Sequence, residues 1–129
     1  MHRSRIGSVV IDCNDFDAGV RFWREALGVP ENTVQIGSRF ASLGQVGGGW
    51  RVLIQRVPEP KTCKSRVHLD IESDDIDAEV QRLEALGATR VEPFGHAPGW
   101  VMTDVNGNEF CVLSSGTTPG WPHGIVEWP

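Results

Sequence analysis

The 129-residue sequence lacks features that mark several classes of protein. It has only three cysteines, Cys13, Cys63 and Cys111, and no C-x-x-C pair, which argues against a zinc ribbon and a disulfide framework. Its apolar runs are only a few residues long, too short to cross a bilayer. The basic start, MHRSRIGSVVID, contains no apolar segment of signal-peptide length. We therefore expect a cytoplasmic protein with reduced thiols, and we expect Cys111 to be a small core residue.

Positive charge is also scarce. Lys and Arg number 12 against 17 Asp and Glu, so the net charge is −5, and the basic residues form no cluster. Binding to nucleic acid or to an anionic membrane needs a basic patch, so we expect neither partner. With 40% hydrophobic and 22% charged residues the composition is that of a globular protein. It predicts one domain over residues 1–129 and does not indicate a function.

The chain contains an internal repeat. Residues 9–28, VVIDCNDFDAGVRFWREALG, resemble residues 68–87, HLDIESDDIDAEVQRLEALG. Both segments contain Asp-x-Asp-Ala, at an offset of 60 residues, and both end in Glu-Ala-Leu-Gly, at an offset of 59. Together with one shared Val these are eight identities in about twenty positions, which chance does not readily produce.

Each copy predicts a strand followed by a helix. In the second copy the first strand alternates cleanly, with apolar residues at 67, 69 and 71 and His68, Asp70 and Glu72 on the opposite face. An aspartate, Asp15 or Asp75, then stands at the N-cap position, where its carboxylate accepts first-turn N–H groups. Apolar residues with 4-3-4 spacing form one helix face, and a glycine follows at position 28 or 87 as the left-handed end.

Three further strands complete each copy. We expect them at 34–36, 39–43 and 50–57 in the first copy, and at 89–92, 100–103 and 109–114 in the second. Asn106-Gly107 is a strong hairpin signal. The resulting order is βαβββ twice, with module one at about 5–57, a linker at 58–65, module two at about 66–115, and a tail at 116–129 rich in Pro, Gly and Trp.

This arrangement resembles the vicinal oxygen chelate superfamily, which includes glyoxalase I, bleomycin-resistance proteins and extradiol dioxygenases. The resemblance covers roughly residues 5–115 and rests on RVHLDIESDDIDAEVQRLEALGATRV at 66–91 and GWVMTDVNGNEFCVLSS at 99–115. The VPEPK linker and NEFCVL strand are similar to those of small glyoxalase-like domain proteins. The resemblance implies an α+β fold of tandem βαβββ modules that form an incomplete eight-stranded barrel around a cavity. It also implies a homodimer.

The resemblance also implies where a metal would bind, because each module of metal-binding relatives gives one ligand from its first strand and one from its last. In module two these positions hold His68 and Glu109. In module one the first is Ser8, and the second is Arg51 or Gln55, of which we favour Gln55 because a Gln closes this strand in similar sequences. A hydroxyl and an amide are weak ligands, and a dioxygenase-type iron site needs two histidines.

His68 and Glu109 have alternative roles without a metal. They can hold a polar group of a ligand, or they can act as a catalytic acid–base pair. The simplest alternative is structural: His68 is a hydrogen-bonded residue on the inner face of the sheet, and Glu109 is a carboxylate at a strand edge.

The chain has five tryptophans and no tyrosine. Trp23 lies on the apolar helix face and is predicted to be core. Trp50 and Trp100 each begin a strand beside glycines, where they can line a ligand pocket or hold a cation, or can simply pack under loops. For Trp121 and Trp128 in the tail we expect packing against a sheet edge or a dimer partner.

Two functions from different classes fit these residues. The first is a protein that sequesters a small aromatic or cationic ligand in the barrel cavity without chemistry, as bleomycin-resistance proteins do. In that case it needs no cofactor, and Ser8 in place of a histidine favours it. The alternative is a lyase, isomerase or dioxygenase that uses a divalent metal ion to bind vicinal oxygens of its substrate. His68 and Glu109 favour this second reading.

Overall fold

The computed structural model of the protein describes residues 1–46, 50–114 and 126–129. Contacts between residues divide the chain into two compact units. Unit 1 comprises Met1–Pro58 together with the C-terminal residues, and unit 2 begins at Glu59.

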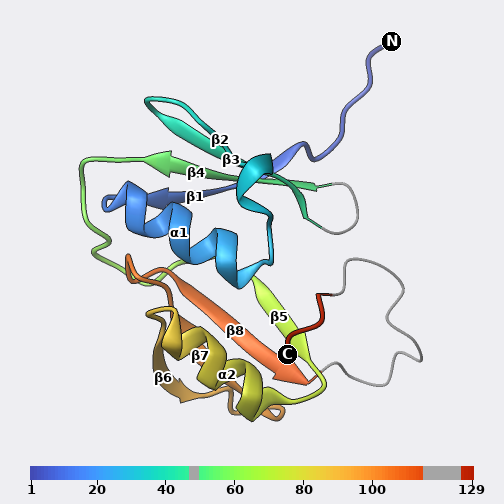
Figure 1. The fold of residues 1–129 in the computed structure, drawn as a ribbon, viewed down its shortest axis with the longest axis vertical. Coiled ribbons are helices and arrows are strands. Elements are labelled where there is room, and N and C mark those ends of the chain that lie inside the picture. The colour runs from blue at the N-terminus through green and yellow to red at the C-terminus, as the bar shows by residue number, and fades with distance from the viewer. Residues whose placement is uncertain (47–49, 115–125) are drawn as a thin grey trace. The chain divides into compact units, whose positions relative to one another are not determined.

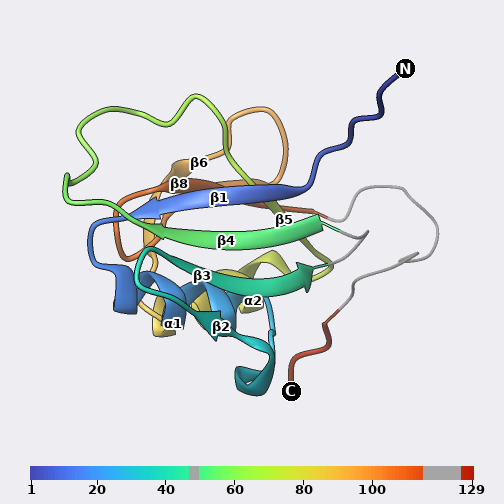
Figure 2. The ribbon, with the colours of Figure 1, turned by 90° about the horizontal axis from the view of Figure 1, so that it is seen from above.

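Unit 1 is a four-stranded mixed sheet with one long helix (Figure 1). The strand order is β1-β4-β3-β2, in which β1 and β4 are parallel and the other neighbours are antiparallel. Figure 2 shows β1, β4 and β3 side by side. In chain order the elements are β1 (Ser8–Cys13), α1 (Phe16–Ala26), the 3₁₀ helix η1 (Glu31–Thr33), β2 (Gln35–Ile36), β3 (Phe40–Val46) and β4 (Trp50–Arg56).

Unit 2 repeats this topology. Its elements are β5 (Asp70–Ser73), α2 (Ile76–Ala85), β6 (Thr89–Pro93), β7 (Gly99–Thr103) and β8 (Glu109–Ser114). The sheet order is β5-β8-β7-β6, again with the first and last strands parallel. The predicted α+β class is confirmed. The strands of the described residues form two separate sheets, so they make no closed barrel.

The first strand of unit 2 is shorter than the alternation predicts. It begins at Asp70, and one hydrogen bond, from the Cys111 N–H to the Leu69 carbonyl at 2.9 Å, extends the pairing by one residue. The chain bends at residues 66–67. Just before this bend, the Ser65 N–H donates to the Glu109 carboxylate at 3.1 Å, and not to a neighbouring strand. His68 consequently lies two residues before the strand and not within it.

Both helices begin and end where the repeat predicts. Asp15 and Asp75 are the N-caps, and their carboxylates accept hydrogen bonds from the third residue of each helix at 3.2 and 3.0 Å. Each helix is followed by a glycine with positive φ, +67° at Gly28 and +110° at Gly87. After α2 the Gly87 N–H donates to the Glu84 carbonyl, and the next N–H donates to the Leu83 carbonyl. This pair of bonds ties the residues after the helix to carbonyls of its last turn.

Each helix covers one face of its own sheet. α1 packs against β4 and β3, and α2 packs against β8. The predicted core position of Trp23 is confirmed, since only 1% of the residue is exposed. The largest fully buried side chains are Phe16, Trp23, Leu43 and Ile54 in unit 1, and Val80, Leu83, Met102, Phe110 and Val112 in unit 2. In the described part of the chain, no helix is long and apolar enough to cross a membrane.

Gly87 offers a test of this packing. A Cβ added there would lie 2.9 Å from Cγ1 of Val105, and the backbone has φ +110°. Gly107 also has positive φ, +84°, but a Cβ there would meet no atom within 4 Å. We expect Gly107→Ala to cost the roughly 1–2 kcal/mol of a left-handed backbone, and Gly87→Ala to cost more because it adds the clash. Urea unfolding of both variants measures the difference, and equal losses would contradict the predicted contact.

Candidate functional site

In unit 2 the pairing of β5 with β8 brings the predicted site residues to one sheet face. Asp70 is opposite Cys111, so the same register continued back by two residues places His68 opposite Glu109. Side chains alternate between faces along a strand. Phe110 and Val112 are buried and α2 packs against β8, so Glu109 and Cys111 face away from the helix. We call this side of each sheet its non-helix face.

Glu109 is held by two donors from the segment that precedes β5. The Lys61 ammonium lies 2.7 Å from one carboxylate oxygen, and the Ser65 N–H donates to the other at 3.1 Å. Burial raises the pKa of the Glu109 carboxyl, but these hydrogen bonds outweigh it and lower the pKa from 4.5 to about 2. The side chains of Lys61 and Glu109 are only 21% and 18% exposed. Glu109 is therefore an ionised carboxylate, and both of its oxygens have partners.

A second cluster on the same sheet face consists of His68, Asp70 and Cys111. The His68 Nε2 and an Asp70 carboxylate oxygen are 3.0 Å apart, and both side chains are 46% exposed. Together with the Cys111 sulfur, these donor atoms all lie within 4.8 Å of one another. Cys111 itself is buried, and burial and the nearby Asp70 charge raise the pKa of its thiol, while Lys64 lowers it.

Sequence reasoning identified His68 in this cluster but assigned Cys111 to the core and gave Asp70 no role. Cys111 is indeed buried. The signal for Asp70 was the alternation that puts it on the same face as His68. No sequence signal showed that Cys111 stands opposite Asp70, because that depends on the strand register.

In unit 1 the register places Ser8 opposite Arg51, whereas Gln55 is opposite Asp12. Ser8 thus corresponds to His68 of unit 2, and Arg51 corresponds to Glu109. All of these unit 1 residues lie on the non-helix face, because the alternating residues Val52 and Ile54 are buried in the core. Gln55 is four residues beyond the register counterpart of Glu109, and its role as a ligand-binding residue stays a prediction.

The tryptophans expected at a pocket lie on the other face of each sheet. Trp50 precedes Arg51 on β4, so it points to the opposite side, and 47% of it is exposed. Trp100 pairs with the buried Val112 and therefore shares the helix side with it. The guanidinium of Arg90 lies 4.7 Å from the centre of the Trp100 ring. Trp100 is thus on the helix face, and His68 and Glu109 are not.

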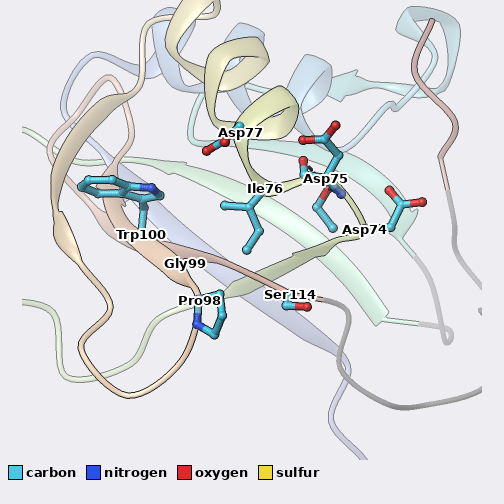
Figure 3. Close-up of a pocket in the computed structure, with 9 residues that line it drawn as sticks. Asp74, Asp75, Ile76, Asp77, Pro98, Gly99, Trp100 and Ser114 are labelled. Carbon is cyan, nitrogen blue, oxygen red and sulfur yellow. Dashed lines mark hydrogen bonds between the residues drawn. The ribbon is translucent and has the colours of Figure 1, made fainter.

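Trp100 does line a pocket on its own side of unit 2. This open pocket of about 440 Å³ lies at the start of α2, and Figure 3 shows Trp100 and Ile76 on its wall with Asp77 nearby. Asp74 and Asp75 also line it. Asp75 is already used as the helix cap. The binding roles of Trp50 and Trp100 stay predictions.

The described part of the tail packs on unit 1. A Cβ added at Gly28 would approach Val126 to 2.8 Å and the Trp128 ring to 3.1 Å, and Val126 lines a pocket of about 310 Å³ with residues 27–30. Trp128 therefore docks against the end of α1, whereas the expected packing was against a sheet edge or a dimer partner. Trp121 lies outside the described residues.

The residues at the positions that the resemblance assigns to a metal are a poor donor set. Ser8 offers a hydroxyl, its register partner Arg51 is a cation, and Glu109 is already paired with Lys61. Only His68 is an ordinary metal ligand with an exposed side chain. These residues do not fit the divalent metal of the superfamily, and we assign no chemistry to it.

Solved structures with the same fold include several related proteins. A glyoxalase-related enzyme from Fulvimarina pelagi has a TM-score of 0.72 at 15% identity, with 98% of this chain and 99% of that chain covered. The fosfomycin resistance protein FosX from Mesorhizobium loti has a TM-score of 0.64 at 17% identity, covering 90% and 94%. A mutant of FosX from Listeria monocytogenes, in complex with Mn(II) and a dihydroxypropylphosphonic acid, has a TM-score of 0.63 at 17% identity, covering 88% and 91%.

No curated protein matches the chain in sequence. The sequence does match the family described as the glyoxalase-like domain, over residues 8–113. That range includes every helix of the structure and begins and ends within its first and last strands. The chain therefore belongs to the glyoxalase-like domain family of the vicinal oxygen chelate superfamily.

Proposed function

We propose that this protein binds a small molecule without the metal-dependent chemistry of a relative such as the Mn(II)-containing FosX. The observation that carries the proposal is the pairing of Glu109 with Lys61 at 2.7 Å and with the Ser65 N–H at 3.1 Å. The carboxylate that the family resemblance assigns to a metal already has a cation and a backbone donor.

Displacing Lys61 would be costly. A metal ion at Glu109 would have to break two hydrogen bonds and leave a mostly buried ammonium without its partner, which costs several kcal/mol in comparable pairs. The register counterpart in unit 1 is Arg51, whose positive charge would repel a metal ion and not bind it. Both positions thus argue against the enzyme alternative that a metal would require.

The ligand, in this proposal, binds against the non-helix face of unit 2. His68 and Asp70 form an exposed pair there, with His68 Nε2 and an Asp70 oxygen 3.0 Å apart, and these groups can contact a polar or cationic group of a ligand. The ligand cavity that the resemblance implies, the cytoplasmic location and the homodimer belong to the proposal and rest on the resemblance and the sequence.

Mn²⁺ binding separates the two functions. We expect the wild-type chain to leave the electron paramagnetic resonance signal of free Mn²⁺ unchanged at equimolar protein, because Glu109 is not available as a ligand. FosX from Listeria monocytogenes, which holds Mn(II) in its solved structure, serves as the positive control. Stoichiometric loss of the free signal with wild-type protein, abolished in Glu109→Gln, would overturn the metal-free proposal and support the enzyme.

The ion pair also predicts how stability depends on pH. Because the pKa of Glu109 is lowered from 4.5 to about 2 in the folded state, its stabilisation is full above pH 4.5 and is lost as the pH falls toward 2. At pH 6 we expect Glu109→Gln to lower the free energy of unfolding by about 1–3 kcal/mol, since it weakens a partly buried charged hydrogen bond. The difference from wild type should shrink in urea unfolding below pH 4.5.

The exposed pair Glu84–Arg90 is the control for that measurement, with side chains 36% and 35% exposed. Glu84→Gln should change stability by less than about 1 kcal/mol, because exposed ion pairs contribute little. A pH-independent effect of Glu109→Gln would show that the Lys61 pair does not stabilise the fold.

Metal-free bleomycin is the probe for ligand binding, because it carries both aromatic and cationic groups. In buffer containing a chelator, we expect isothermal titration calorimetry to show binding that His68→Ala weakens at least about tenfold, a loss of about 1.4 kcal/mol. His96→Ala, which removes an exposed histidine of the 94–98 loop, should leave the affinity unchanged. Equal affinities for the two variants would remove His68 from the binding site.

A further inference from the structure

We infer that His68, Asp70 and Cys111 form a binding site for a thiophilic divalent cation such as Zn²⁺. This site shares His68 with the metal position that the resemblance implies, but Asp70 and Cys111 take the place of Glu109. It goes beyond the proposed function, because the His68–Asp70 pair, proposed there to contact a small molecule, would also hold a metal ion.

The geometry brings three different donors together. The His68 Nε2 and the Asp70 oxygen are 3.0 Å apart, and the Cys111 sulfur completes a group whose atoms lie within 4.8 Å of one another. Bonds of about 2.0–2.3 Å put the donors of a tetrahedral zinc ion roughly 3–4 Å apart. Small side-chain movements of His68 and Asp70 are therefore enough to bind an ion.

Strand pairing holds the deepest donor in place while the other two can adjust. Cys111 is 3% exposed, it stands opposite Asp70, and its N–H donates to the Leu69 carbonyl at 2.9 Å. His68 precedes β5, and its side chain and that of Asp70 are each 46% exposed. An ion can reach the group from the side of these two residues, and a fourth position is left for a water or a ligand oxygen.

The donor types select the metal. A thiolate favours Zn²⁺, Co²⁺ or Cd²⁺ over Mn²⁺ and Mg²⁺, which prefer oxygen donors. Imidazole, carboxylate and thiolate together are ordinary zinc ligands. Metal binding releases the proton of the Cys111 thiol, and the resulting thiolate and Asp70 then supply two negative charges for a divalent cation. The neighbouring Lys61 is paired with Glu109.

Cobalt is the direct probe because it reports on sulfur coordination. We expect Co²⁺, added to the full chain under reducing conditions and without an affinity tag, to give thiolate-to-cobalt charge-transfer absorption and tetrahedral visible bands. Zn²⁺ should displace it. Cys111→Ser should abolish the charge-transfer band, while His68→Ala and Asp70→Asn should each weaken binding by more than the roughly 10–100-fold typical of an outer-shell change.

Two controls make the outcome decisive. Cys63→Ser removes the exposed cysteine, and Glu109→Gln removes the superfamily ligand; both should keep the cobalt spectrum. A band that is absent from wild-type protein, or that disappears in Cys63→Ser, overturns the site. If Cys111→Ser does not fold, the exposed substitutions at 68 and 70 decide, because unchanged cobalt affinity in both also overturns it. Loss of the spectrum in Glu109→Gln would place the metal at the superfamily position instead.

Discussion

The parallel pairing of the first and last strands within each unit decides which side chains can act together. In unit 2 this pairing sets Asp70 opposite Cys111 and carries His68 to the level of Glu109. In unit 1 the same topology sets Ser8 opposite Arg51. A shift of the register by one residue would send each of these side chains to the other face of its sheet. The chemistry of both non-helix faces therefore depends on backbone hydrogen bonds that involve none of these side chains.

The Lys61–Glu109 ion pair determines what the carboxylate of Glu109 can bind. A carboxylate at this position can serve as a metal ligand, but here its oxygens are taken by Lys61 and the Ser65 N–H. The same two contacts hold the segment that precedes β5. This segment bends at residues 66–67, and β5 begins only at Asp70, after His68. Beside this pair, His68 and Asp70 are each 46% exposed.

Local features of the fold were predictable, because they depend on residues close in sequence. The helix caps Asp15 and Asp75 and the glycines that end both helices follow from short-range hydrogen bonding and backbone freedom. The early start expected for β5 was wrong, because alternation does not reveal where a strand finds its partner. The side of the sheet on which Trp100 lies was likewise not predictable, since the register of β7 places it on the helix side.

The sequence by itself determined that the chain is a duplicated βαβββ unit that resembles the glyoxalase-like family. The repeat and the helix caps could be recognised because each depends on residues that are close together in the sequence. The sequence also singled out His68 and Glu109. Only the tertiary structure decided what these residues meet. Glu109 is paired with a lysine 48 residues away, and His68 and Asp70 lie beside a cysteine that β8 brings alongside β5. Contacts between distant segments depend on strand register and on the path of the connecting chain, and neither is encoded in a local pattern.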